Sequence, residues 1–250
     1  MRVDDCKVKS SVGSGVDCRL VTYRDMDVNR ETGMDMDKNV DIDELTPLGG
    51  EEYYGREIWG NLQKFAQMLV DEGEIRGLIG PRERQRLWTR HIFNSTAVEE
   101  FISQGSTVGD IGSGAGFPGL VLAIIRPDVN VTLIDSMERR TQWLMDVTKE
   151  LSLPNVSVKT GRAESFVGNF SADYVTARAV AALKKLLPWT MPLVKPGGSL
   201  IALKGIKVEQ EIIEAQQQLR DYNADWVDIY QVTPFGCKES TRIVEVKKLM

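Results

Sequence analysis

The feature that most constrains this sequence is a glycine-rich turn inside the segment Val108–Gly119, which reads VGDIGSGAGFPG. Its first residues favour a strand, and Pro118 suits the first turn of a helix, so the segment predicts a strand that turns sharply into a helix. Gly112, Gly114 and Gly116 have no Cβ and allow positive φ, which lets backbone N–H groups of the bend face a bound molecule. The turn therefore predicts a ligand at the end of a strand; the alternative is a tight turn that binds nothing.

The charge beside the turn bears on which ligand it takes. The residues Gly114–Gly119 also fit the dinucleotide pattern GxGxxG, which is weak evidence when it stands alone. Asp110 lies two residues before the first glycine, and a carboxylate there repels a pyrophosphate but attracts a sulfonium and an ammonium group. We therefore expect S-adenosyl-L-methionine as the cofactor and keep an NAD-dependent oxidoreductase as the alternative.

Charge and composition divide the 250 residues into three parts. Residues 1–52 hold 13 Asp and Glu against 7 Lys and Arg, whereas the remainder holds 23 against 24, so the surplus of negative charge lies in the first part. Because that part is poor in aromatic residues and shows no periodicity, it predicts a disordered acidic tail over 1–52. A helical cap is predicted over 53–105 and a catalytic domain over 106–250.

Metal, disulfide and membrane sites are not expected. Asp35 to Asp43 imitate a calcium loop, but Val40 and Thr46 stand where that loop needs Gly and Glu. The three cysteines form no CxxC pair, and His91 is the single histidine, which excludes a multi-histidine metal site. There is no run of about 18 apolar residues and no apolar start typical of a signal peptide. We expect a monomeric protein in the cytoplasm.

Two helical stretches are predicted before the glycine turn. Apolar residues recur at helical spacing from Ile58 to Leu69, which indicates an amphipathic helix that ends near Glu72. A second helical stretch follows Pro81 and joins an apolar face to a group of arginines. These arginines are Arg82, Arg84, Arg86 and Arg90.

After Gly105, strands and helices alternate, which is typical of a doubly wound, mostly parallel sheet. The last two strands follow one another without a helix, so the sheet is expected to end in an antiparallel hairpin. The predicted strands are 107–111, 130–134, 156–160, 172–176, 199–203, 226–232 and 243–247. The predicted helices are 118–126, 138–151, 180–191 and 208–222.

Four further landmarks follow strand ends and are expected on the same rim as the glycine turn, because parallel strands end at one edge of a sheet. Asp135 can accept ribose hydroxyls, or it can cap the helix that follows. Ala163 and Glu164 are placed to meet an adenine, although Glu164 is equally a candidate exposed loop residue. Arg178 can stack on a ring or bind a phosphate, and Lys204 is expected to face the same rim.

These residues together resemble the bacterial 16S ribosomal RNA guanine-N7 methyltransferases, also called glucose-inhibited division protein B. The resemblance covers roughly residues 59–247. It rests on motifs in the family's order: RHIFNS from Arg90, DIGSGAGFPG from Asp110, Ala163-Glu164, Ala177-Arg178-Ala179 and ALKG ending at Gly205. It departs from many members at Gly73–Pro81, which affects the detail of the cap and its RNA contacts but not the cofactor turn.

The resemblance implies a class I, Rossmann-like S-adenosylmethionine-dependent methyltransferase with a seven-stranded sheet and an N-terminal helical cap. It also implies contacts of the chain with S-adenosylmethionine, Asp135 lying near the ribose. The residues implied in these contacts are Gly112, Phe117, Ala163, Glu164 and Arg178. The implied partner is 16S ribosomal RNA or the small ribosomal subunit, and the implied target is a guanine near the decoding centre.

Guanine N7 carries a lone pair in the plane of the ring, so its methylation requires placement against the methyl group and no prior deprotonation. We expect Arg178 and Lys204 to position the guanine or its phosphate. Arg90 and His91 are expected to hold the RNA or the closed cofactor pocket, although His91 is equally a candidate structural histidine. A methyltransferase acting on another RNA, a protein or a small molecule stays an alternative, as does an RNA-binding module without activity.

Overall fold

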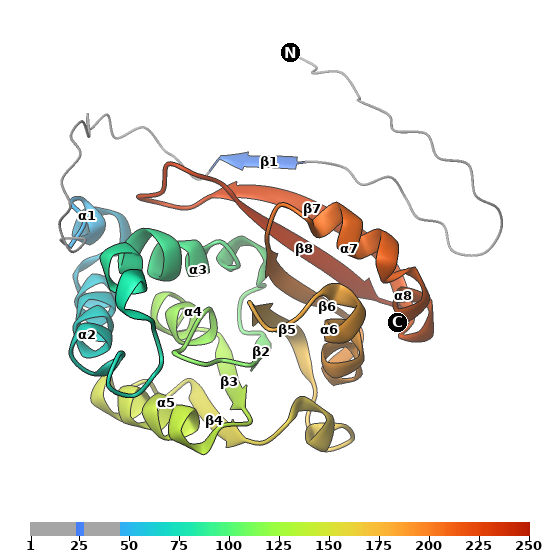
Figure 1. Cartoon of the computed structure of the whole chain (residues 1–250), viewed down its shortest axis with the longest axis horizontal. Coiled ribbons are helices and arrows are strands. Elements are labelled where there is room, and N and C mark those ends of the chain that lie inside the picture. The colour runs from blue at the N-terminus through green and yellow to red at the C-terminus, as the bar shows by residue number, and fades with distance from the viewer. Residues whose placement is uncertain (1–23, 28–45) are drawn as a thin grey trace, which may run out of the picture.

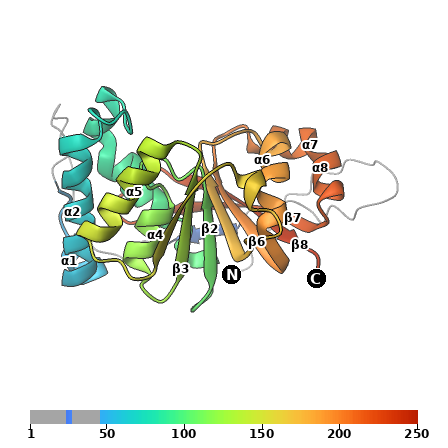
Figure 2. The same cartoon turned by 90° about the horizontal axis from the view of Figure 1, so that it is seen from below.

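The computed structural model describes residues 24–27 and 46–250 and has three layers, with one twisted sheet between two layers of helices (Figures 1 and 2). The sheet has eight strands in the order β1-β7-β8-β6-β5-β2-β3-β4. The strands are β1 (Arg24–Asp27), β2 (Thr107–Ile111), β3 (Asn130–Asp135), β4 (Val156–Thr160), β5 (Ala172–Arg178), β6 (Val194–Lys204), β7 (Ala224–Thr233) and β8 (Thr241–Lys248).

The predicted parallel sheet with an antiparallel end is confirmed. Strands β2 to β6 pair in parallel, whereas β8 runs antiparallel to both β6 and β7. The chain passes from β2 to β3 on one side and later returns to place β5 on the other side of β2. This change of direction lies at β2, and open α/β sheets bind their ligands at the carboxyl ends of the strands at such a point.

One strand was not predicted. The four residues of β1 pair in parallel with Tyr230–Thr233 of β7, at the edge of the sheet, and they fall inside the segment expected to be disordered. The resemblance to a calcium loop at Asp35 to Asp43 lies outside the described residues, as does the rest of the tail up to residue 45.

Each face of the sheet has its own apolar core. Helices α4 (Gly119–Ile125) and α5 (Glu138–Glu150) cover one face together with the cap, and their buried side chains form one continuous cluster with those of the cap. Helices α6 (Leu183–Thr190), α7 (Val208–Glu214) and α8 (Gln216–Asp221) cover the other face and form a second cluster. The helix predicted over 208–222 is thus two helices, which meet at Ala215.

The cap begins with α1 (Gly50–Tyr54) and α2 (Arg56–Glu72). The apolar spacing of α2 has the predicted effect, because its buried residues lie on one face against the sheet domain; they are Trp59, Leu62, Phe65, Ala66 and Leu69. After Pro81 the chain departs from a regular helix. It forms a 3-10 turn, η1 (Pro81–Arg86), then a π-helix, η2 (Leu87–Phe93), followed by α3 (Asn94–Thr96) and a second 3-10 turn, η3 (Glu99–Phe101).

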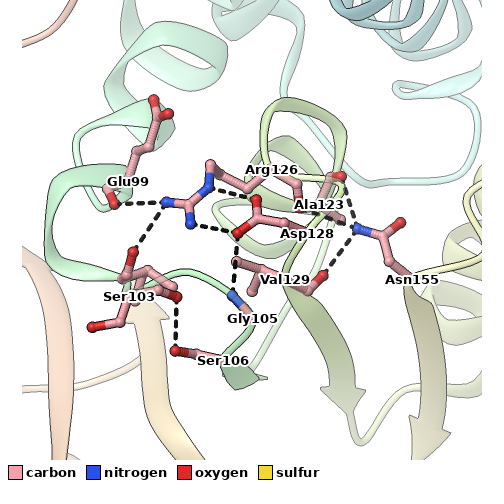
Figure 3. A network of polar contacts seen from close by, with 10 residues as sticks. Glu99, Ser103, Gly105, Ser106, Ala123, Arg126, Asp128, Val129 and Asn155 are labelled. Atoms are coloured by element: carbon pink, nitrogen blue, oxygen red, sulfur yellow. Dashed lines mark hydrogen bonds and ion pairs between the residues drawn. The ribbon is translucent and has the colours of Figure 1, made fainter.

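A polar network joins the cap to the amino ends of the strands (Figure 3). The Arg126 guanidinium donates to both carboxylate oxygens of Asp128, at 2.7 and 2.8 Å, and to the carbonyl of Ile102 at 3.0 Å. The Asp128 carboxylate also accepts the N–H of Gly105, and the hydrogen bonds from Arg126 lower the pKa of Asp128 to about 2. The end of the cap is therefore held to the end of α4 by charge-assisted hydrogen bonds.

In the part of the chain that the structure describes, no helix has both the length and the apolar character needed to cross a lipid bilayer.

Candidate active site

The three glycines of the turn all have positive φ, at 71° for Gly112, 57° for Gly114 and 111° for Gly116. A Cβ on Gly112 would lie 2.8 Å from the Val180 side chain, and one on Gly116 would lie 2.5 Å from Leu120. A Cβ on Gly114 would meet only the carbonyl oxygen of Gly112, at 3.7 Å. Packing therefore requires the first and third glycines, whereas Gly114 faces open space that a bound molecule can occupy.

Asp110 lies beneath the turn and not on its open side. The residue is fully buried; its Oδ1 accepts the Thr176 hydroxyl at 2.9 Å and its Oδ2 accepts the Gly119 N–H at 3.2 Å. Burial raises the pKa of Asp110 to about 6, although these hydrogen bonds oppose that effect. Its oxygens anchor the turn to the start of α4 and to β5, and the expected attraction of a cationic cofactor to this carboxylate stays a prediction.

Asp135 connects the turn to α5. Its Oδ2 accepts the N–H of Gly114 at 3.0 Å, and its Oδ1 accepts the N–H of Met137 at 2.9 Å, just before α5 begins. The capping role considered for Asp135 is not observed, because Met137 is the N-cap residue of α5 and no side chain caps the first turn of that helix. Oδ2 also lies 3.6 Å from Nη1 of Arg140, and the Asp135 side chain is buried. Its contact with a ribose hydroxyl stays a prediction.

Ala163 and Glu164 begin a short 3-10 turn, η4 (Ala163–Phe166), after β4. Ala163 is buried and Glu164 is exposed. The turn lies beside Asp135, since the N–H of Gly161 donates to the backbone carbonyl of Asp135 at 2.9 Å. The ends of β3 and β4 therefore lie side by side, as predicted. The contact of Glu164 with an adenine stays a prediction.

Arg178 lies at the end of β5, and its guanidinium contacts the cap. It donates to the backbone carbonyl of Arg90 at 3.0 Å and to Nδ1 of His91 at 2.8 Å. Its Cζ lies 4.7 Å from the centre of the Phe117 ring, which belongs to the glycine turn. Burial lowers the pKa of Arg178 to about 10, partly offset by the charge of Asp110. The predicted base or phosphate contact competes with these intramolecular contacts.

His91 completes a chain of contacts to a residue that the sequence analysis missed. Its Nε2 lies 2.7 Å from the carboxylate of Glu83, and its ring stacks on Phe117 with centroids 5.2 Å apart. Burial, together with the charge of Arg178, lowers the pKa of His91 to about 4. The imidazole is therefore neutral near pH 7. Glu83 stands out in retrospect as the one carboxylate among the arginines of η1.

Lys204 reaches the predicted rim but its ammonium group points into the protein. It donates to the Ala181 carbonyl and, at 2.8 Å, to Glu211, and only 7% of the side chain is exposed. The same Glu211 oxygen accepts the N–H of Leu183 at the start of α6. The expected contact of Lys204 with a guanine or phosphate is corrected to a structural ion pair that holds the segment after β5.

Two aromatic residues support the turn from behind. The indole N–H of Trp143, on α5, donates to the Ala115 carbonyl at 3.0 Å, and Phe65, on α2, lies against Phe117 with ring centroids 5.7 Å apart. Both side chains are fully buried. The helical spacing of apolar residues from Ile58 to Leu69 predicted that Phe65 is a core residue. Nothing in the sequence connected Phe65 or Trp143 with the turn.

Comparison with known proteins agrees with this geometry. The GidB family, described as rRNA small subunit methyltransferase G, matches residues 59–233. A ribosomal RNA small subunit methyltransferase G from Thermobifida fusca is 47% identical over 195 residues, which cover 76% of this chain and 82% of that protein. The protein of that name from Corynebacterium glutamicum is 42% identical over 209 residues, covering 81% and 92%.

Among solved structures, a SAM-dependent O-methyltransferase from Thermotoga maritima superimposes with a TM-score of 0.51 at 14% identity, over 63% of this chain and 65% of that one. At that identity the likeness shows the fold alone, which is that of a Rossmann-like methyltransferase. The family match spans the cap from residue 59 onwards, the glycine turn and all strand ends of the rim. The chain therefore belongs to the GidB family, that of the rRNA small subunit methyltransferase G.

Proposed function

We propose that this methyltransferase transfers a methyl group from S-adenosyl-L-methionine to N7 of a guanine in 16S ribosomal RNA. The observation that carries the proposal is the open space above Gly114, bordered by Asp135 at the neighbouring strand end. The carboxylate of Asp135 suits a ribose hydroxyl of an adenosine-bearing ligand. The backbone N–H groups of the turn already donate within the protein; they are those of Gly112, Ser113, Gly114, Gly116 and Phe117. When bound there, S-adenosylmethionine supplies a methyl group activated by a sulfonium.

The ionisable groups beside the turn suit a transfer that needs no general base. Both ring nitrogens of His91 are engaged, one with Glu83 and one with Arg178, and its pKa of about 4 keeps the ring neutral. The carboxylate of Asp110 is buried under the turn. The residues around the turn therefore fix its shape and exclude water, which is the contribution that an in-plane lone pair requires of its catalyst.

The arginines of the cap are our candidates for contact with RNA. Arg82 and Arg86 are exposed on η1, and half of the Arg90 side chain is exposed while its carbonyl accepts Arg178 beside the turn. Arginine pairs well with phosphate, and phosphate contacts position RNA without reading its sequence. We propose that these side chains hold the ribosomal RNA backbone next to the cofactor, with a monomer in the cytoplasm as the active form.

The test is to map N7-methylguanine in 16S ribosomal RNA by chemical cleavage after incubating undermethylated small subunits with the enzyme and S-adenosylmethionine. Wild type should create one cleavage site, and Gly114→Leu should create none because leucine fills the space above the turn. The matched control is Gly105→Leu: Gly105 also has positive φ, at 72°, and open space around it, but it lies at the amino end of β2.

Each outcome of this experiment decides a different point. Retained methylation in Gly114→Leu would refute the assignment of the turn to the cofactor. Methyl transfer to a ribosomal protein, or to another RNA atom, would refute the guanine N7 target while leaving the cofactor in place. Equilibrium binding of NAD in preference to S-adenosylhomocysteine would favour the oxidoreductase instead.

A further inference from the structure

A chain of three polar side chains crosses from the cap to the end of β5. Glu83 on η1 contacts Nε2 of His91 on η2 at 2.7 Å, and Nδ1 of His91 contacts the Arg178 guanidinium at 2.8 Å. Phe117 of the glycine turn lies against both His91 and Arg178, at 5.2 and 4.7 Å from its ring centre. The turn is therefore bordered by a chain of hydrogen bonds whose far end is Glu83.

The chemistry of the three groups determines which ring nitrogen of His91 carries the proton. A guanidinium can only donate, so Nδ1 of His91 has to accept from Arg178. The proton of the neutral ring is then on Nε2, which donates to the Glu83 carboxylate. Burial tends to raise the pKa of Glu83, but the hydrogen bond from His91 and the charge of Arg90 outweigh it and lower this pKa. Glu83 is thus an ionised acceptor.

We propose that Glu83 is a positioning residue of the cofactor site, which acts by holding His91 in the Nε2–H tautomer. In that tautomer Nδ1 accepts from Arg178 and keeps the guanidinium over Phe117. Without an acceptor at Glu83, only Arg178 favours this tautomer, so the alternative tautomer becomes populated. It places an N–H of His91 against an N–H of Arg178, and because two partly buried donors that face each other are unfavourable, the guanidinium would leave the ring. The inference rests on the proposed function, because it takes the turn as the cofactor site.

The single histidine of the chain makes this inference directly measurable. In a ¹⁵N-labelled protein, the two imidazole nitrogen signals come from His91 alone and report its tautomer. Wild type should show the Nε2–H form. Glu83→Gln keeps an acceptor oxygen and should keep that form, whereas Glu83→Ala should give a mixture of tautomers. Glu57→Ala, which removes an exposed carboxylate of α2 in the same cap, is the matched control.

Calorimetric titration with S-adenosylhomocysteine provides the second measurement. We expect the Kd of Glu83→Ala to rise about tenfold, which corresponds to the loss of roughly one hydrogen bond to a charged group. Glu83→Gln and Glu57→Ala should bind as wild type does. Glu83→Met, which keeps the length of the side chain without an acceptor, should behave like Glu83→Ala and replaces it if the alanine variant does not fold.

The outcomes separate the two proposals. An unchanged tautomer in Glu83→Ala, or an unchanged Kd despite a changed tautomer, would overturn the positioning role while wild type still binds S-adenosylhomocysteine. Failure of wild type itself to bind S-adenosylhomocysteine would overturn the cofactor assignment, and the positioning role with it. A loss of affinity in Glu83→Gln equal to that in Glu83→Ala would show that charge, and not the tautomer, is what the site needs.

Discussion

Lys204 shows how a residue at the rim can support the site without touching a ligand. Its ammonium group and the Glu211 carboxylate form an ion pair from which water is largely excluded, with 7% and 22% of the side chains exposed. The same carboxylate accepts the first N–H of α6, and Lys204 also holds the carbonyl of Ala181. The pair therefore fixes the segment whose Val180 packs against Gly112.

Lys204→Met should lower the free energy of unfolding by about 3 kcal/mol, because it leaves the Glu211 carboxylate partly buried without its cation. Urea denaturation measures this change. The double variant Lys204→Met/Glu211→Gln should recover most of the loss and most of the methyl transfer. If Lys204→Met instead keeps full stability but loses methyl transfer, the lysine acts on the substrate after all.

The imidazole of His91 should stay neutral down to a pH near 4, because burial and the neighbouring Arg178 lower its pKa from 6.5 to about 4. The unfolded chain binds the proton more readily between these values, so the contribution of His91 to stability is complete above pH 6.5 and is lost as the pH falls towards 4. Asp110 acts in the opposite sense, because its pKa is raised to about 6 and its contribution is lost as the pH rises.

The two effects overlap in wild type, so the measurement has to isolate His91. Titration of its imidazole signals by NMR should give a midpoint near pH 4. The stability difference between wild type and His91→Gln in urea should shrink from pH 7 to pH 5. A midpoint near 6.5, or a stability difference that grows on acidification, would contradict the burial of a neutral ring.

At the scale of elements, η1 carries both a residue that supports His91 and exposed arginines. Glu83 faces inwards to His91, whereas Arg82 and Arg86 are exposed on the same turn. A 3-10 turn repeats every three residues, so Arg82 points to a different side from Glu83, whereas Arg86 lies in the same row as Glu83 and its charge acts on that carboxylate. The turn can therefore support the cofactor site on one side and present positive charge on the other.

Arg82→Ala/Arg86→Ala should weaken binding of the ribosomal RNA by about tenfold at moderate salt and reduce the dependence of affinity on salt, because two phosphate contacts are lost. Binding of S-adenosylhomocysteine should not change. Arg220→Ala, which removes one exposed positive charge on α8 across the sheet, is the control and should bind RNA as wild type does. A steep salt dependence that survives the double substitution would place the RNA elsewhere.

The positions of the strands from β2 to β8 could be predicted from the sequence, because each contains β-branched or apolar residues bounded by turn residues. The start of β6 at Val194 could not, because Pro196, Gly197 and Gly198 indicate a turn there. Ala215 could not be recognised as a helix boundary, since alanine favours a helix on both sides of it. The π-helix η2 carries the same apolar residues as a regular helix would, and only its packing distinguishes the two. The tail strand β1 depends on pairing with β7, which is distant in the sequence.

The candidate site divides in a similar way. The strand ends placed Asp135, Arg178 and Lys204 on one rim, because the edge at which a parallel strand ends follows from topology. The direction of a long side chain does not follow from topology. Lys204 points inwards because Glu211, seven residues later, supplies a buried partner, and Arg178 turns to the cap because His91 and the Arg90 carbonyl accept its hydrogen bonds.

At the scale of the whole molecule, the cap and the sheet share one apolar core. Phe65 of α2 lies against Phe117 of the glycine turn, and the cluster continues through Leu120 of α4 into Val131 of β3. The sequence pattern changes at residue 105, but the apolar core continues across that boundary between the cap and the sheet. We propose that the two parts unfold together.

Phe65→Ala should lower the free energy of unfolding by about 3–5 kcal/mol, because it removes a fully buried ring. Tryptophan fluorescence and far-ultraviolet circular dichroism should show one coincident transition.

S-adenosylhomocysteine should bind more weakly to Phe65→Ala, since Phe117 loses its support. Leu187→Ala, in the core on the other face of the sheet, should reduce stability without weakening that binding. Two separate transitions would contradict the shared core.

The contact of Phe117 with Phe65, His91 and Arg178 has a consequence for genetics. A turn that is supported from both parts of the chain can be deformed by substitutions in either part. Alleles without activity should therefore arise through many exchanges of buried cap residues as well as through the few glycines of the turn. A genetic selection for loss of this enzyme should therefore recover substitutions at many positions. Most of these positions should lie in the buried core, without contact to cofactor or RNA.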